Sequence, residues 1–271
     1  MIRHERGKLT YFSYKLFESF KEVTNIVSSR IGGVSQKPFY SLNVGLNVAD
    51  EEAAVIKNRK LLCEAVGVKL HSLVACRQTH ETKIAIAGDP ARGRGAFKWS
   101  DGLLETDGLI TNVPELPLFI TVADCAVLSF FDPKHKVAAI AHAGWRGIAG
   151  KIARKTVFAM KEAFGCNPQD ILVGISPLIG PCCYRIGKEV VKSFYEAFGS
   201  QSLKFFIRQP DGCFHLDLHP AIRCQLEEAG TRQEQIESSP VCPACRLDLF
   251  YSHRAECGRT GRFAGLISLV N

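Results

Sequence analysis

The sequence predicts a single α/β domain built around a mixed β-sheet, and three observations support this. Apolar runs rich in strand-forming residues alternate with helical patterns along the chain. Two of these runs, Val127–Phe131 and Val137–Ala141, are separated by a short Asp-Pro-Lys-His turn that suits an antiparallel hairpin. The 271 residues contain no repeat, charge block or Pro/Gly/Ser-rich linker, so we expect one domain over residues 1–271.

The individual elements follow from the same patterns in chain order. Leu16–Val27 is an apolar run broken by polar residues, and we expect it to contain a strand. Ala53–Val66 has helical periodicity, and Ser72–Arg77 is expected to be a strand that closes in Gln-Thr-His. The further expected strands are Leu118–Val122, Val127–Phe131, Val137–Ala141, Ile171–Ile175 and Phe263–Val270, and the further expected helices are Gly150–Phe164, Lys188–Phe198 and Pro220–Ala229.

Composition narrows the function classes. No apolar run approaches the roughly 20 residues that span a bilayer, and the start of the chain lacks the apolar segment of a signal peptide, so we expect a cytoplasmic protein without membrane contact. The net charge of +7 suits anionic small molecules, but without a Lys/Arg block we expect no nucleic-acid partner. Eleven cysteines, an odd number, indicate reduced thiols, some of which are candidates for metal binding.

The segment Val137–Gly150, VAAIAHAGWRGIAG, is the most informative for function. A buried strand runs into His142, a small-residue turn follows, and Arg146 lies at the start of a helix. Helix-start N–H groups, nearby glycines and a guanidinium together make a candidate anion site, and Arg146 is therefore our candidate phosphate ligand. The alternative is that Arg146 is a solvated helix-start residue and His142 a strand-end histidine with a structural partner.

Asp124 and Cys125 end the apolar run LFITVADC, where side chains often form a site. Cys125 is a candidate nucleophile activated by His142, a candidate thiolate metal ligand, or a buried structural cysteine. His80, Cys125 and His142 together would supply one thiolate and two imidazoles, a set that leaves zinc an open fourth position. The separations of 45 and 17 residues match no short zinc motif, so spacing alone does not establish the site.

Several turn-rich segments are candidate pocket walls. The loop pair RIGGVS and SLNVG contributes Arg30, Ser41 and Asn43, and the turn IGPCCY contributes Cys182 and Tyr184. We interpret these, together with Gln78, as substrate-binding candidates. Plain structural turns explain such segments equally well, because Gly, Pro, Asn and Ser also serve turns for backbone reasons.

The last part of the chain contains candidate ligands for a second metal site. Cys242-Pro243-Ala244-Cys245 is a CxxC pair, and His253 and Cys257 follow downstream. Four such ligands would close a structural zinc knuckle. A lone CxxC is a weak signal, however, and the intervening Leu249-Phe250-Tyr251 favours a packed strand instead.

Six segments in order, SSRIGGVSQKPFYSLNVG, RQTH, TVADC, HAGWRG, ISPLIGPCCY and TGRFAGLI, resemble the YfiH family, the laccase-domain proteins once named polyphenol oxidases. The resemblance runs from about Arg30 to the end of the chain. It implies a layered α/β/β/α sandwich with mixed sheets, also likened to cysteine hydrolases. It further implies a purine nucleoside phosphorylase for adenosine, inosine and S-methyl-5'-thioadenosine that also deaminates adenosine, with zinc on His80, Cys125 and His142.

The sequence departs from the family pattern at one place. Where the family often shows Phe-Ser-Tyr-Arg-Arg, this chain reads Tyr251-Ser252-His253-Arg254-Ala255, so only Ser252 and Arg254 carry over. The resemblance makes Arg254 a further substrate-binding candidate. If the second arginine of that motif contacts phosphate or ribose, its absence here weakens that contact.

The candidate mechanisms differ in what they require. Multicopper oxidation requires many imidazoles with His-X-His pairs, whereas this chain has eight histidines and no such pair. Copper is therefore expected here only as an adventitious or alternative metal. Phosphorolysis needs an anion cradle, which we assign to Arg146, and zinc-assisted deamination needs a proton-transferring carboxylate, which we assign to Asp124. The rivals are a metal-free cysteine hydrolase or amidase using Cys125 and His142, and a copper-dependent phenol oxidase. The sequence does not predict the oligomeric state.

Overall fold

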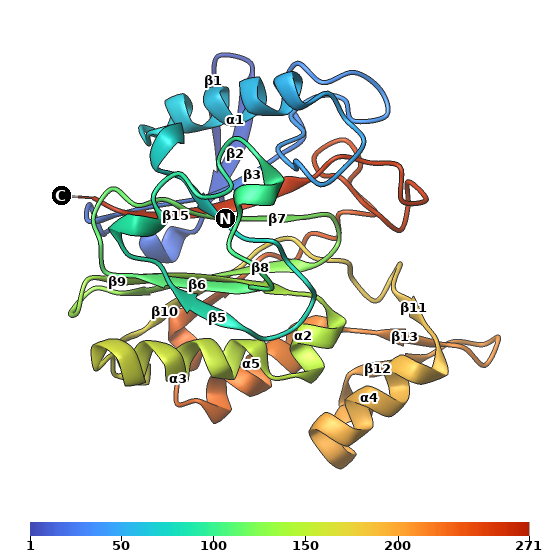
Figure 1. Cartoon of the computed structure of the whole chain (residues 1–271). Coiled ribbons are helices and arrows are strands. Elements are labelled where there is room, and N and C mark those ends of the chain that lie inside the picture. Colours follow the sequence, from blue (N-terminus) through green and yellow to red (C-terminus); the bar gives the residue numbers. More distant parts are fainter. Residues whose placement is uncertain (271) are drawn as a thin grey trace.

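The computed structural model describes residues 1–270, and two six-stranded sheets packed face to face form its centre (Figure 1). In spatial order the first sheet is β1 (Ile2–Arg6), β2 (Leu9–Ser13), β3 (Val23–Ser28), β15 (Phe263–Leu269), β7 (Leu118–Val122) and β4 (Val74–Ala75). The second is β14 (Ile236–Ser238), β10 (Leu172–Ile175), β8 (Ala126–Asp132), β9 (Val137–Ala143), β6 (Gly108–Thr111) and β5 (Ile84–Ile86). Both mix parallel and antiparallel pairs.

Helices cover the outer face of each sheet (Figure 1). Helix α1 (Glu52–Val66) lies on the first sheet, while α2 (Trp145–Ala149), α3 (Ile152–Phe164) and α5 (Leu218–Glu228) lie on the second. A three-stranded sheet of β11 (Arg185–Ile186), β13 (Phe214–Leu216) and β12 (Phe206–Arg208) stands to one side with α4 (Lys188–Phe198). Short 3₁₀ helices occupy Lys15–Phe17, Leu70–Ser72, Asp89–Ala91, Trp99–Asp101, Pro168–Asp170, Gly199–Lys204 and Gln233–Gln235.

The central strands are mostly apolar because both of their faces are buried. In β15, Phe263 and Ile267 pack between the sheets, whereas Ala264 and Leu266 face the cluster that includes α1. The sheets approach so closely at Gly265 that an added Cβ would lie 2.5 Å from Val127. The α/β/β/α layering implied by the family resemblance is therefore confirmed.

Several expected elements are confirmed with the bounds predicted from the sequence or nearly so. Leu118–Val122 and Lys188–Phe198 form β7 and α4, and β8 and β9 form the expected antiparallel hairpin, closed by the pair Asp132 and Val137. Helix α3 begins at Ile152 rather than Gly150, because Lys151 has a left-handed backbone (φ 67°) that separates α3 from α2. Helix α5 begins before Pro220, because the Asp217 side chain caps it.

Other expectations were wrong or incomplete. The run Leu16–Val27 does contain a strand, but β3 begins only at Val23, because the first apolar residues of the run form the 3₁₀ turn Lys15–Phe17. The β1–β2 hairpin was missed, since β1 lies at the edge of the first sheet with much of its length exposed and shows little apolar pattern. In residues 1–270 no helix combines the length and the apolar character needed to cross a bilayer.

Candidate active site

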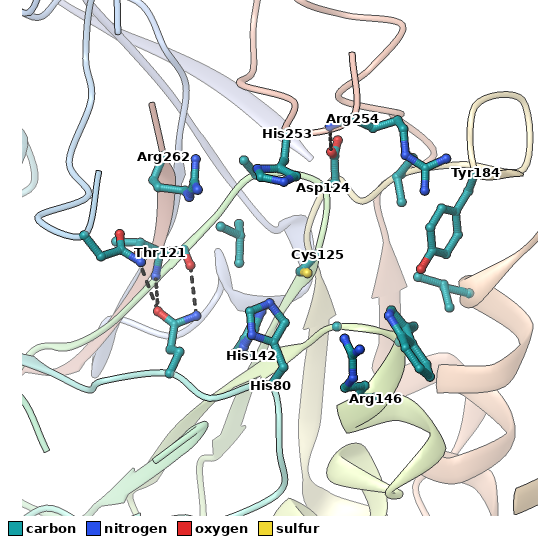
Figure 2. Close-up of a pocket in the computed structure, with 18 residues that line it drawn as sticks. His80, Thr121, Asp124, Cys125, His142, Arg146, Tyr184, His253, Arg254 and Arg262 are labelled. Atoms are coloured by element: carbon teal, nitrogen blue, oxygen red, sulfur yellow. Dashed lines mark hydrogen bonds between the residues drawn. The ribbon is translucent and has the colours of Figure 1, made fainter. Parts of the chain in front are cut away.

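A pocket of about 440 Å³ opens where the two central sheets end together (Figure 2). At this end β7 finishes, β15 begins, β8 begins and β9 finishes. Loops from distant parts of the chain therefore meet there. The lining residues are Asn47, Gln78, His80, Thr121, Val122, Ala123, Asp124, Cys125, His142, Gly144, Trp145, Arg146, Ile179, Tyr184, Leu218, His253, Arg254 and Arg262.

His80, Cys125 and His142 converge at the floor of this pocket (Figure 2). His142 is the penultimate residue of β9 and lies on the face that Ala138 and Ile140 turn toward the first sheet, because alternate strand residues share a face. One candidate ligand atom from each of the three residues lies within 4.8 Å of the others, and the two imidazole rings are 4.6 Å apart between centroids. The structure thus brings together the three predicted metal ligands.

Asp107, which the sequence analysis missed, organises this set. Its buried carboxylate accepts a hydrogen bond from His142 Nδ1 at 2.7 Å and from the backbone N–H groups of Thr79, His80 and Glu81 at 3.0–3.1 Å. The contact at Nδ1 leaves Nε2 of His142 for a metal, an arrangement common around metal-bound histidines. The sequence gives only a weak indication of a role for Asp107, which is that its carboxylate stands directly before the short run that forms β6.

The electrostatics favour a thiolate at Cys125. Burial alone would raise the pKa of this thiol, but the imidazoles of His142 and His80 outweigh it and lower the pKa to about 6. Burial likewise disfavours charge on His142, but Cys125 and Asp107 raise its pKa to about 9. Despite burial, hydrogen bonds from His142 and backbone N–H groups lower the pKa of Asp107 to about 2. Cys125 therefore takes the form that binds metals and attacks electrophiles.

Gly144 leaves open space beside the three candidate ligands. A Cβ at this position would lie 3.1 Å from Cys125 Sγ, 3.1 Å from His80 Cδ2 and 3.7 Å from His142 Nε2. Only a residue without a side chain leaves room next to the donor atoms. The donor set, one thiolate with two imidazoles and an open side toward the pocket, fits zinc.

Asp124 has an unusual backbone and a fully engaged carboxylate. Its φ of 87° is rare for a residue other than glycine and places strain beside the site. The two carboxylate oxygens accept hydrogen bonds from Ser252 Oγ and Arg254 N, both at 2.7 Å. Burial raises the pKa of this carboxyl against the effect of those bonds. Asp124 therefore anchors the turn that carries His253 and Arg254 to the pocket rim.

Cationic and aromatic side chains surround the floor of the pocket. Arg146 lies over the Trp145 ring at 4.2 Å, and Arg254 lies 5.2 Å from the centre of the Tyr184 ring. In Figure 2 Arg262 lies on the opposite side of the floor from Arg146. Trp145 and Arg262 are pocket residues that the sequence analysis did not assign as candidates. The pocket thus offers guanidinium groups for an anion and flat aromatic surfaces for a base.

Gln78 lines the pocket and fixes its wall. The Gln78 amide donates to Thr121 O at 3.0 Å and accepts from Thr121 N at 3.2 Å. This pair of bonds ties the loop after β4 to the end of β7. The amide group is thereby engaged by the backbone.

Arg30, Ser41 and Asn43 lie outside the pocket lining. Arg30 donates to Leu247 O at 2.9 Å and stacks on a tyrosine ring, and Ser41 Oγ accepts from the N–H groups of the Gly32-Gly33 turn. Asn43 is fully buried, and its Oδ1 accepts from Arg262 N at 2.8 Å. Of the three, only Asn43 is linked by hydrogen bond to a pocket residue, and it supports Arg262 from behind.

The cysteines of the carboxy-terminal third are arranged differently from the expected knuckle. Cys242 and Cys245 lie together with Cys182 and Cys183, with all four sulfur atoms within 4.8 Å of one another. The expected ligands His253 and Cys257 do not belong to this group, and His253 lines the pocket instead. Cys182 is therefore placed in a four-cysteine cluster and not in the pocket lining.

Fold and site together define a layered α/β protein with a His/Cys/His site at the open end of two stacked sheets. The chain belongs to the YfiH family: the family described as multi-copper polyphenol oxidoreductase laccase matches residues 24–270. The chain is similar to "Purine nucleoside phosphorylase YlmD" of Bacillus subtilis, with 37% identity over 92% of this chain and 89% of the relative.

Solved structures agree with this assignment. The YfiH protein of Bacillus licheniformis superimposes with a TM-score of 0.92 at 38% identity, covering 98% of this chain and 97% of that one. YlmD from Geobacillus stearothermophilus superimposes with a TM-score of 0.93 at 34% identity, covering 99% and 98%.

Proposed function

We propose that this protein is a zinc-dependent purine nucleoside phosphorylase that accepts adenosine, inosine and S-methyl-5'-thioadenosine and also deaminates adenosine. The observation that carries the proposal is the convergence of His80, Cys125 and His142 on the floor of a pocket walled by guanidinium and aromatic groups. The names of the curated relatives support the same reaction. Because the pocket draws on residues from Asn47 to Arg262, we infer that the whole chain acts as one domain.

In phosphorolysis a phosphate oxygen attacks C1' of the ribose, the C1'–N9 bond breaks, and the purine leaves with the bonding electron pair and gains a proton. Arg146 is the proposed phosphate ligand, because it is exposed at the pocket wall beside the glycine turn after β9. Tyr184 and Trp145 are proposed to pack on the base. His80, Cys125 and His142 would hold the zinc ion, which would supply Lewis acidity in the site.

Asp124 is the proposed proton-transfer group in deamination. Burial raises the pKa of its carboxyl, which moves it toward the range useful for exchanging protons at neutral pH. Its hydrogen bonds to Ser252 and Arg254 keep the group at the pocket rim. The alternative is that Asp124 only positions the turn at the pocket rim. Asp124→Asn distinguishes proton transfer from this positioning role.

Zinc fits the residues better than a copper cluster does. Among residues 1–270, the candidate metal groups contain only three histidines: His80, His142 and His135. The first two share one group with Cys125, and His135 lies in another with Asp132 and Cys166. Multicopper oxidation depends on imidazole-rich sites, so we do not propose it for this chain.

A metal-free cysteine hydrolase is the second candidate, and one observation favours it. Cys125, His142 and Asp107 form a thiolate–imidazole–carboxylate series like the triads of cysteine hydrolases. His80, however, places a second imidazole against the same sulfur, which a metal site needs and a triad does not. A loss of zinc in Cys125→Ala separates the two, because a metal-free triad would lose none.

The test combines metal analysis with a substrate panel. Purified protein washed with a mild chelator is assayed for zinc, and adenosine, inosine and S-methyl-5'-thioadenosine are incubated with and without phosphate and read by mass. We expect free base from all three only with phosphate, inosine from adenosine without it, and loss of the zinc bound at this site in Cys125→Ala. Full zinc occupancy in Cys125→Ala would show that the ligand set is wrong, and no turnover of any nucleoside would overturn the reaction class.

A further inference from the structure

Four cysteines gather outside the pocket lining, in the loops that follow two neighbouring strands of the second sheet. The sulfur atoms of Cys182, Cys183, Cys242 and Cys245 all lie within 4.8 Å of one another. Cys245 Sγ is 3.4 Å from both Cys182 Sγ and Cys183 Sγ. Nothing in the proposed reaction uses these thiols.

The fold explains why these residues meet. Strands β10 and β14 are parallel neighbours, so the loops that follow them leave the same edge of the sheet. Ser239 N donates to Ile175 O at 2.9 Å and keeps the two loops together past the last strand pair. One loop then reaches the adjacent cysteines 182 and 183, and the other reaches the CxxC pair.

Both loops form tight turns that aim sulfur atoms at a common point. Cys183 N donates to Gly180 O at 3.0 Å, and Cys245 N donates to Cys242 O at 3.1 Å. A Cβ at Gly180 would lie 3.3 Å from Cys182 Sγ and 3.8 Å from Cys242 Sγ. The glycine therefore lets the first turn approach the second closely enough for all four sulfurs to meet.

The sulfur positions suit a metal better than a disulfide. Bonded sulfurs are about 2.05 Å apart. Four thiolates at about 2.3 Å around a tetrahedral zinc are about 3.8 Å from one another, close to the spacing of this cluster. Four sulfur ligands also leave no open position for a substrate, so a metal here is structural.

We propose that Cys182, Cys183, Cys242 and Cys245 bind a structural zinc ion that fastens one wall of the pocket. Tyr184, a pocket residue, directly follows Cys183. Arg254 donates to Arg185 O at 2.9 Å, so the rim of the pocket is attached to the same turn. The zinc holds this turn against the loop that leads from β14 into the His253–Arg254 rim.

The first test counts zinc in the intact protein purified under reducing conditions. We expect two zinc ions per chain in the unaltered protein and one in Cys182→Ser/Cys245→Ser. Cys257→Ser is the matched control, since Cys257 is exposed and outside the cluster, and it should keep both ions. Unchanged zinc in the double variant, or zinc loss in the control alone, would overturn the proposal.

A second measurement avoids substituting the cluster, in case the double variant fails to fold. Cys125→Ala should retain one zinc ion, and X-ray absorption at the zinc edge should show four sulfur ligands at about 2.3 Å. Mixed nitrogen and sulfur ligands would overturn the proposal. An iron–sulfur chromophore, or a disulfide within the cluster found by mass after alkylation of the purified protein, would also overturn it. Because the two sites are counted in separate variants, failure of this proposal is distinguishable from failure of the pocket zinc.

Discussion

Asp107→Asn tests whether this buried carboxylate sets the metal-binding form of His142. Oδ1 of Asp107 accepts from His142 Nδ1 and His80 N, and Oδ2 accepts from Thr79 N, Thr79 Oγ1 and Glu81 N. An asparagine must place its NH₂ group at one of these positions. In place of Oδ2 it faces two backbone N–H groups, and in place of Oδ1 it faces one backbone N–H group and the imidazole.

The second orientation costs less, because it leaves one backbone N–H unpaired instead of two. An unpaired buried N–H costs about 1–3 kcal/mol, and the exposure of the 79–81 turn places this one near the lower limit. In this orientation His142 accepts at Nδ1 and carries its proton on Nε2, the nitrogen that should bind zinc. We therefore expect a loss of about 1 kcal/mol in stability and a 10- to 100-fold loss of zinc affinity at the pocket site, the usual range for such a supporting residue.

Zinc affinity is measured by competition with a chromophoric chelator, and stability by urea unfolding of the zinc-free protein. Asp124→Asn is the matched control, because it removes a carboxylate beside Cys125 that contacts Ser252 and Arg254 and neither histidine. It should keep wild-type zinc affinity. Unchanged affinity in Asp107→Asn would refute the argument that Asp107 selects the His142 tautomer.

Three further substitutions test the remaining assignments. Asp124→Asn should lower turnover about 10²-fold or more with zinc retained if Asp124 transfers protons, whereas retained turnover would remove it from the catalytic group. Arg146→Lys keeps the charge but loses the planar fork, so it should raise the phosphate concentration needed for phosphorolysis more than it slows deamination; equal losses would contradict a phosphate contact. Gly144→Ala places a methyl group 3.1 Å from Cys125 Sγ and His80 Cδ2, and it should weaken zinc binding in the chelator assay without unfolding the chain; normal zinc binding would show that the three ligands do not share one ion.

The sequence predicted the elements whose patterns come from burial. Strand β7 and helix α4 match their expected bounds, because β7 is packed on both faces and α4 has a clear apolar side. The edge strand β1 gave no such pattern, since exposure removes the demand for apolar residues. The short strands β5, β11 and β14 were not predicted for a related reason, because two or three residues are too few to show the alternation of apolar and polar residues that marks a strand.

The candidate site was predictable where its residues end strongly patterned strands. His142 and Cys125 follow apolar runs directly, so their meeting at one end of the sheets was a reasonable expectation from the sequence. Asn43 shows the limit of such reasoning. Its loop reads like a pocket wall, but the side chain turns inward to hold Arg262 N, and residue type does not tell which way a loop side chain points. Asp107 was missed because its role depends on a contact 35 residues away, with His142.

The four-cysteine cluster marks the same limit for metal sites. The CxxC pair predicts further ligands downstream, at His253 and Cys257, because short zinc motifs keep their ligands close in sequence. The structure instead brings in Cys182 and Cys183, about 60 residues upstream, through the parallel pairing of β10 with β14. β14 is three residues long and carries a central glutamate, so no apolar pattern predicts that it pairs with β10. Ligands supplied by loops after parallel strands are set by the strand order of the sheet, and strand order is what a single sequence reveals least.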